Sequence, residues 1–158
     1  MRLRTVDYCH AEAILNTNMR LKQEIVGILQ TINLTGLESE IPPHRFVQEA
    51  FKRHGWKSEV LVSGRTFRRH YFDLCKDRVA IEIELSQRET LYRDYLRFLL
   101  AEQEGMIDVG VIITWDARLE ANFVEPASHT RVDLQQVRDD LSWLGYWLRT
   151  PIWVIGVS

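Results

Sequence analysis

The chain has 158 residues, 46% of them hydrophobic, and a formal net charge of −2, so we expect one globular domain over residues 1–158 with a substantial hydrophobic core. The nearly neutral charge excludes a uniformly basic nucleic-acid-binding surface, so any such affinity has to come from local basic patches. Only Cys9 and Cys75 are present, without a CxxC motif, and no apolar run is long enough to cross a membrane, which excludes a disulfide framework and a membrane partner and predicts a cytoplasmic protein.

Helical periodicity dominates the first third of the chain, and strand-like runs follow it. Gly36 and the Pro42-Pro43 pair end the first helical region, because glycine and proline interrupt regular structure. Gly55 ends the next helix, as glycine commonly does just beyond a helical C-terminus. The elements predicted here are one or two helices within residues 10–32, a helix at 44–54, a strand at 60–62, and a hairpin of strands at 68–75 and 78–86.

The second half of the chain alternates helices with apolar strands. The predicted elements are helices at 88–104 and 132–148, strands at 109–114 and 152–157, and a loop at 116–131. Both of these strands are nearly continuous apolar runs, which is typical of strands covered on both faces. The order of elements therefore predicts an α/β fold in which helices flank a mixed β-sheet.

The hairpin carries three acidic residues on one face, Asp73, Glu82 and Glu84. Side chains in a strand alternate between faces, and a turn at Lys76-Asp77 would place Asp73 opposite Ala80. The other face is apolar: Phe72, Leu74, Val79, Ile81, Ile83 and Leu85. Carboxylates in an apolar strand are costly to bury without a partner, and clustered carboxylates suit a hard cation such as Mg2+. The alternative is a solvated strand face, since 22 of the 158 residues are acidic.

This order of elements, with an acidic hairpin at this position, is similar to that of the PD-(D/E)xK nucleases, and several segments resemble the BglII-type restriction endonucleases in particular. The matching segments follow one another along the chain at 5–16, 73–86, 104–114 and 126–136. The resemblance implies a restriction-endonuclease-like core and a Mg2+-dependent endonuclease that cuts double-stranded DNA. Such hydrolysis needs a nucleophilic water and neutralisation of the developing charge, and carboxylate-held Mg2+ provides both.

The resemblance also implies roles for individual residues. Asp73 would be the bridging metal ligand, and the main-chain carbonyl of Ile83 a second ligand. Glu82 would bind the metal or its water, and Glu84 would occupy the position that is lysine in most of the superfamily. Glu49, on the helix at 44–54, is a further candidate acid, although its position on that helix favours solvent.

Two groups of residues match positions that approach bases or phosphates in this family. The base-contact candidates are Ser86 and Gln87 after the acidic strand, and Ser128, His129 and Thr130 after the loop proline. Glutamine reads adenine bidentately, and serine or threonine reads several bases. The basic pair Arg68 and Arg69 would contact phosphates, which positions DNA without specifying sequence. For His129 the alternative is a simple loop residue, and for the arginines exposed strand charges.

A homodimer is expected, because a palindromic DNA site is matched by a two-fold protein and two strands need two active sites. The helix at 88–104 is the candidate interface, since its apolar positions go beyond one narrow stripe. The expected partners are therefore double-stranded DNA and a second copy of the chain.

Two alternatives remain open. The first is a nuclease of DNA repair or defence with loose sequence preference, against which a neighbouring methyltransferase gene would argue. The second is a catalytically inactive DNA-binding domain that retains the fold, which an absence of stabilisation by divalent metal would favour.

Overall fold

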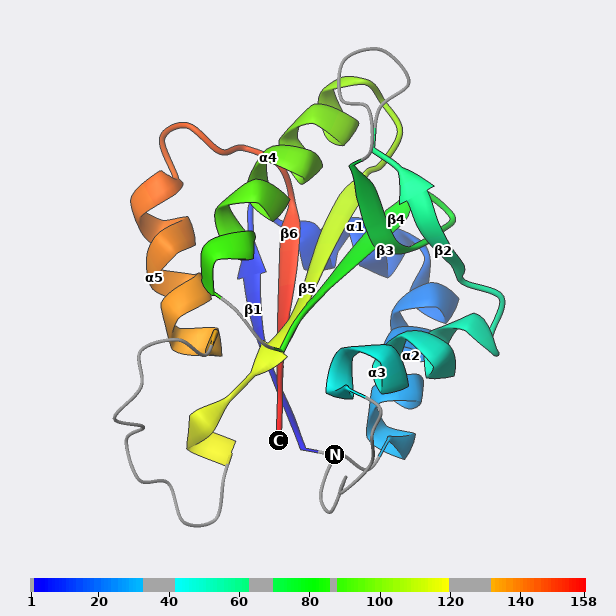
Figure 1. The fold of residues 1–158 in the computed structure, drawn as a ribbon. Helices are drawn as coiled ribbons and strands as arrows, with labels where there is room; N and C mark the ends of the chain where they lie inside the picture. Colours follow the sequence, from blue (N-terminus) through cyan, green and yellow to red (C-terminus); the bar gives the residue numbers. More distant parts are fainter. Residues whose placement is uncertain (1, 33–41, 63–69, 86–87, 120–131) are drawn as a thin grey trace.

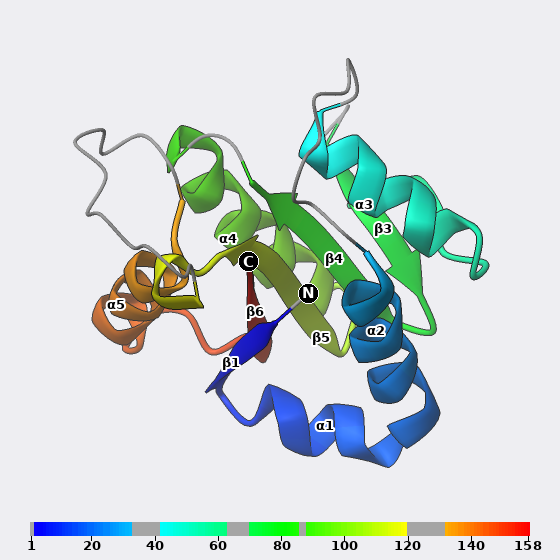
Figure 2. The ribbon, with the colours of Figure 1, turned by 90° about the horizontal axis from the view of Figure 1, so that it is seen from below.

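The structure is a computed structural model that describes residues 2–32, 42–62, 70–85, 88–119 and 132–158. Within these residues six strands form one mixed sheet in the order β1-β6-β5-β4-β3-β2, with helices on both faces (Figure 1, Figure 2). The strands β4, β5 and β6 run parallel, and the other neighbours pair antiparallel. The elements in chain order are β1 (Leu3–Tyr8), α1 (Ala11–Thr17), α2 (Met19–Thr31), α3 (Pro43–Lys52), β2 (Lys57–Leu61), β3 (Tyr71–Lys76), β4 (Val79–Glu84), α4 (Arg88–Gln103), β5 (Val109–Trp115), the short 3-10 helix η1 (Ala117–Leu119), α5 (Leu134–Leu144) and β6 (Ile152–Val157).

The sheet separates two hydrophobic layers. On one face α1, α2 and α3 pack against strand residues such as Ile81 and Ile155. On the other face α4 and α5 pack against their neighbours in sequence, Ala80 and Val154, as the alternation of strand side chains requires. The predicted mixed α/β sheet is thereby confirmed, and β6 is buried along its whole length. None of the described helices combines the length and hydropathy that a membrane span needs.

One strand of the sheet has no counterpart in the prediction. Residues 3–8 form β1, which pairs antiparallel with β6 at the edge of the sheet. Its side chains are half-buried or exposed, so the segment carries little of the hydrophobic alternation by which strands are predicted. The helical region that follows divides at Asn18, whose side-chain oxygen accepts from the Leu21 amide and caps α2.

The hairpin turn between β3 and β4 lies one residue later than predicted. Asp77 and Arg78 occupy its central positions, with φ angles of 47° and 64°, as a two-residue turn of type I′ requires. Aspartate tolerates this left-handed region better than most residues. Arg78 is fixed there by two hydrogen bonds to the Asp108 carboxylate, at 2.8 and 2.7 Å. A partner distant in sequence thus selects the turn.

The later turn shifts the pairing of β3 with β4 by two residues. Cys75 pairs with Ala80, and the regular pairing ends at Leu74 with Ile81, so Asp73 is the next residue beyond it and lies near Glu82. The prediction that Asp73 faces Ala80 is therefore wrong. The prediction that it shares a face with Glu82 and Glu84 does not depend on this shift, because strand side chains repeat every two residues.

Candidate active site

The regular pairing of β3 with β4 ends at Leu74, and Asp73 is the next residue beyond it. Phe72 packs in the layer of α4, stacked on Phe98 with ring centroids 5.6 Å apart, whereas Leu74 packs in the opposite layer. The sequence-based placement of Phe72 and Leu74 in one apolar layer is therefore wrong. Between them, Asp73 turns its carboxylate toward β4, and the Ile83 amide donates to its Oδ2 atom at 2.8 Å.

The backbone around Asp73 is held from two sides. The amide and carbonyl of one strand residue point toward the same neighbour, so the Ile83 carbonyl faces the side on which Asp73 lies. From α3, the Gln48 side chain donates to the main-chain oxygen of Asp73 at 3.1 Å. The next residue, Glu49, is exposed and pairs with Lys52 at 2.6 Å. The contribution of α3 is thus an amide and not the candidate acid Glu49.

The two glutamates of β4 are buried and face α4. Glu82 is 2% exposed and Glu84 is 8% exposed. Arg97 donates from one nitrogen, Nη1, to Glu82 Oε1 at 3.0 Å and to Asp94 Oδ1 at 2.8 Å. The Thr90 hydroxyl donates to Glu84 Oε2 at 2.6 Å. Each glutamate therefore has a partner on the helix that covers it.

Burial and repulsion between neighbouring carboxylates raise the pKa values of Glu82, Asp73 and Asp94. For Glu82, burial and the nearby Asp73 raise the pKa to about 8 against the opposing effect of Arg97. For Asp73, burial raises the pKa, while the Ile83 amide opposes it. For Asp94, burial and the neighbouring carboxylates of Glu84 and Glu82 raise the pKa to about 10. Four neighbouring carboxyl groups thus share one guanidinium, and an added cation would favour their ionised forms.

The donor atoms fit a magnesium ion. Asp73 and Glu82 offer carboxylate oxygens and Ile83 a carbonyl oxygen, which are the hard ligands that Mg2+ prefers. In the described part of the chain, no group of three or more His, Cys, Asp or Glu side chains could hold a metal ion alone.

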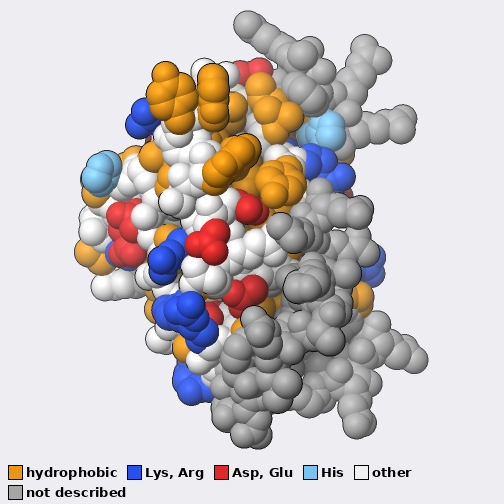
Figure 3. All heavy atoms as spheres, turned by 90° about the vertical axis from the view of Figure 1, so that its left-hand side faces the viewer, with side chains coloured by type: hydrophobic (Ala, Val, Ile, Leu, Met, Phe, Trp, Pro, Cys, Tyr) orange, Lys and Arg blue, Asp and Glu red, His pale blue; other side chains and the backbone are white. Residues whose placement is uncertain are grey.

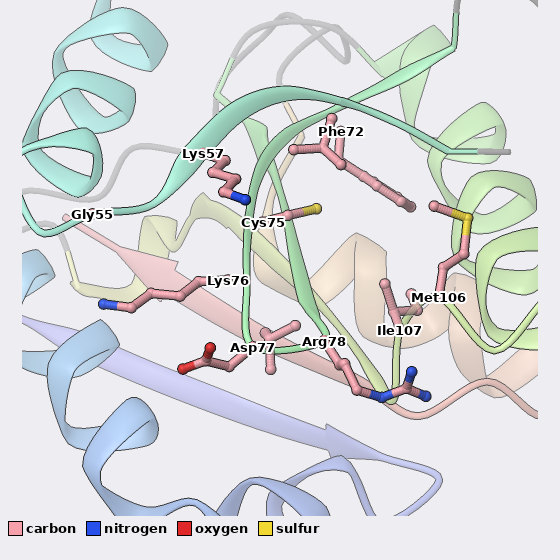
Figure 4. Close-up of a pocket in the computed structure, with 11 residues that line it drawn as sticks. Gly55, Lys57, Phe72, Cys75, Lys76, Asp77, Arg78, Met106 and Ile107 are labelled. Carbon is pink, nitrogen blue, oxygen red and sulfur yellow. The ribbon is translucent and has the colours of Figure 1, made fainter. Parts of the chain in front are cut away.

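A separate cavity of about 380 Å³ lies beside the hairpin turn (Figure 4). Its lining includes Phe72, Cys75, Met106 and Ile107, together with Lys57. None of the three acidic hairpin residues lines it. Burial raises the pKa of the Cys75 thiol to about 12, which leaves it a weak nucleophile at neutral pH. The cavity is therefore separate from the cluster of Asp73, Glu82 and Glu84.

The predicted DNA-contact residues lie outside the described residues and stay predictions. They are Arg68, Arg69, Ser86, Gln87, Ser128, His129 and Thr130.

Three polar residues of α4 contact the site without having been predicted as part of it: Thr90, Asp94 and Arg97. The sequence holds one signal for them, since they interrupt the apolar face of α4 that carries Leu91 and Phe98. Periodicity alone identifies that face as buried but not which strand residue each polar group meets.

Comparison with known proteins identifies the family and the fold. The family model described as "Restriction endonuclease BglII/BglIII" matches residues 3–157. The crystal structure of restriction endonuclease BglII complexed with a DNA 16-mer is 22% identical, with a TM-score of 0.80 over 99% of this chain and 76% of that chain. The crystal structure of free BglII is also 22% identical, with a TM-score of 0.70 over 100% and 80% of the two chains. No curated protein sequence matches the chain significantly.

The similarity to these solved structures shows that the fold is shared, which confirms the predicted restriction-endonuclease-like core. The family model adds more than fold, because it covers nearly the whole chain. The chain therefore belongs to the BglII/BglIII family of restriction endonucleases, which are type II site-specific deoxyribonucleases.

Proposed function

We propose that this chain is a Mg2+-dependent nuclease of the PD-(D/E)xK type that hydrolyses phosphodiester bonds at specific sites in double-stranded DNA. The observation that carries the proposal is the acidic hairpin. It places the Asp73 carboxylate on the Ile83 amide and near Glu82, with Glu84 two residues further along the same strand. Buried carboxylates need compensating charge, and a divalent cation that also binds a DNA phosphate would supply it.

The residues divide between holding the metal and handling water. Asp73, Glu82 and the Ile83 carbonyl would hold Mg2+, which when bound lowers the pKa of water and neutralises charge on the phosphate. Glu84 would orient the attacking water and accept a proton from it. The hydrogen bond from Thr90 supports this role, because it fixes one oxygen of the Glu84 carboxylate.

The residues that we propose as DNA contacts are those predicted from the sequence. Ser86 and Gln87 directly follow the acidic strand, and with Ser128, His129 and Thr130 they would read base edges. Arg68 and Arg69 directly precede β3 and would bind phosphates. The solved complex of BglII with DNA supports DNA as the substrate.

The proposed partner is a second copy of the chain, bound through an aromatic surface. This surface comprises five exposed residues of α4, α5 and the turn that follows α5: Tyr92, Leu96, Trp143, Tyr146 and Trp147. Trp143, Tyr146 and Trp147 are each more than three-quarters exposed, which is unusual for side chains of this size. Hydrophobic side chains gather on this side of the molecule (Figure 3). The surface includes part of the predicted 88–104 interface and extends it to α5.

The direct test is digestion of a supercoiled plasmid in Mg2+, in EDTA, and with the Asp73→Asn variant. We expect discrete fragments with Mg2+ and none in EDTA or with the variant, because Asp73 is the central ligand. A smear that the variant loses would indicate a nuclease without site specificity. Cleavage that survives the substitution would contradict the assigned site, and DNA binding without any cleavage would indicate an inactive binding domain.

A further inference from the structure

The helix α4 presents a polar stripe to the acidic strand. Thr90, Asp94 and Arg97 are separated by four and three residues, so they lie on one face of the helix. That face is otherwise apolar and packs in the layer of Phe98. Asp94 is completely buried, and the Arg97 side chain is 14% exposed.

Two residues of the stripe each donate a hydrogen bond to one of the two glutamates of β4. Thr90 meets Glu84 at 2.6 Å, and Arg97 meets Glu82 at 3.0 Å. Asp94 stands between them and accepts a second hydrogen bond from the same Arg97 nitrogen at 2.8 Å. The helix therefore fixes one oxygen of each glutamate.

Packing a helix against a sheet does not require such a buried polar stripe. Buried charged groups are expensive to desolvate, and apolar residues of similar size often stabilise a protein equally or better. The Arg97 Nε atom is moreover buried without a hydrogen-bond partner among the described residues. What the polar stripe provides, and leucines could not, is a fixed orientation for two carboxylates that neighbour Asp73.

On the basis of the nuclease function proposed above, we propose that Thr90, Asp94 and Arg97 are positioning residues, which hold Glu82 ready for the divalent cation and Glu84 ready for the attacking water. Arg97 and Asp94 act on the metal ligand, and Thr90 acts on the water-handling residue. The two halves of the stripe therefore affect different quantities.

The Thr90 half is tested with Thr90→Val and Thr90→Ser, which differ in the hydroxyl group. Valine keeps the shape and removes the donor, so kcat for plasmid cleavage falls about tenfold or more with KM for DNA unchanged. Serine restores the donor and restores kcat. Binding of Mn2+ to the DNA-free protein, measured by calorimetry, stays at the wild-type affinity in both variants, because Glu84 is not a ligand in this assignment. An unchanged kcat in Thr90→Val would overturn the role of Thr90.

The Arg97 half is tested by the same calorimetry on Arg97→Met, with Arg97→Lys as the conservative variant. Mn2+ takes the same oxygen ligands as Mg2+. We expect about tenfold weaker binding in Arg97→Met, because Glu82 loses the hydrogen bond that fixes it, and partial recovery in Arg97→Lys. The matched control is Arg93→Met, on the exposed side of α4, which binds Mn2+ like the wild type. Wild-type affinity in a folded Arg97→Met would overturn the role of Arg97.

Failure of this proposal is distinguishable from failure of the nuclease assignment. If the wild type cuts DNA and Asp73→Asn does not, the nuclease assignment stands, and only the α4 variants decide the positioning role. If Arg97→Met does not fold, Thr90→Val still decides the proposal, since it removes a single hydroxyl group.

Discussion

At the scale of single residues, charge balance governs the site. Asp73, Glu82, Glu84 and Asp94 are close enough to influence one another, and Arg97 is the cation that contacts two of them among the described residues. Carboxylates in such a group cannot all ionise without a counter-ion. We therefore expect the site to hold protons at neutral pH when no metal is bound, and a bound divalent cation to release them.

This balance predicts how stability depends on pH. The folded pKa of Glu82 is about 8, against an ordinary value of 4.5, so the folded state holds its proton more tightly than the unfolded state. The resulting stabilisation is complete below the ordinary value and is lost as the pH rises through about 8. We expect the Tm in EDTA to fall between about pH 5 and about pH 9.

Two additions sharpen this measurement by thermal scanning. Mg2+ should raise the Tm more at the alkaline end than at the acidic end, because it replaces the lost protons. Glu82→Gln should flatten the pH dependence, because its side chain does not titrate. A Tm that rises steadily with pH in EDTA would contradict the charge balance.

Asp94 offers a second prediction at this scale. Burial raises its pKa to about 10, and its Oδ1 atom accepts a hydrogen bond from Arg97 at 2.8 Å. Asp94→Asn keeps an acceptor for Arg97, so cleavage should stay within about threefold of the wild type, whereas Asp94→Leu removes it and should lose about tenfold or more. Equal activity of the two variants in the plasmid assay would exclude a role for this hydrogen bond.

Some site residues follow from the sequence and others do not. The sequence predicts that Asp73, Glu82 and Glu84 share a face whether the turn falls at Lys76 or one residue later, because the shift moves the pairing by two positions. It does not predict that the alternation of β3 breaks at Asp73, where Phe72 and Leu74 pack in opposite layers. The contact between Arg97 and Glu82 joins residues of different elements, and its geometry depends on how α4 crosses the sheet. Local spacing contains no information of that kind.

At the scale of elements, the packing of α4 on β5 depends on a glycine. A Cβ atom on Gly110 would approach the Phe98 ring to 2.7 Å, whereas one on Gly27 in α2 would meet nothing within 4 Å. We therefore expect Gly110→Ala to lower the free energy of unfolding by about 1–3 kcal/mol through overpacking. Gly27→Ala should raise it by about 0.5–1 kcal/mol, since alanine favours the helix interior.

Urea unfolding of both variants checks this pair. In the double variant with Phe98→Leu, Gly110→Ala should cost less than it does alone, because the two positions are in contact. If Gly110→Ala proves neutral, the helix is not held as closely against β5 as the structure has it.

The elements differ in how well the sequence predicts them. Strands β5 and β6 are apolar along their length and buried, so composition alone identifies them as central. β1 is an edge strand whose side chains are half-buried or exposed. Its pairing with β6 depends on backbone hydrogen bonds that any sequence can make. The turn at Asp77-Arg78 depends on Asp108, which is thirty residues away.

At the scale of the whole molecule, α4 joins the site to the proposed interface. Its inner face carries Asp94 and Arg97, and its outer face carries Tyr92 and Leu96. A two-fold dimer formed through the outer faces would present two acidic sites related by symmetry, as two antiparallel DNA strands require.

The aromatic surface predicts the effect of one charge. Trp147→Glu places a carboxylate where a partner would bury the ring, so the dimer should dissociate to monomers in sedimentation equilibrium, with the Tm of the monomer changed little, because Trp147 is 77% exposed. Gln23→Glu, at an exposed position of α2, serves as the charge-matched control. A wild type that sediments as a monomer even on cognate DNA would contradict the proposed dimer.

The most direct measurement is to sequence the DNA ends produced from a large genome by the wild type in Mg2+ and by Asp73→Asn. We expect all wild-type ends to lie within one two-fold symmetric DNA sequence, with both strands cut at equivalent positions. We expect the variant to produce no such ends. Ends scattered without a common sequence, or the same ends from the variant, would contradict a site-specific nuclease centred on Asp73.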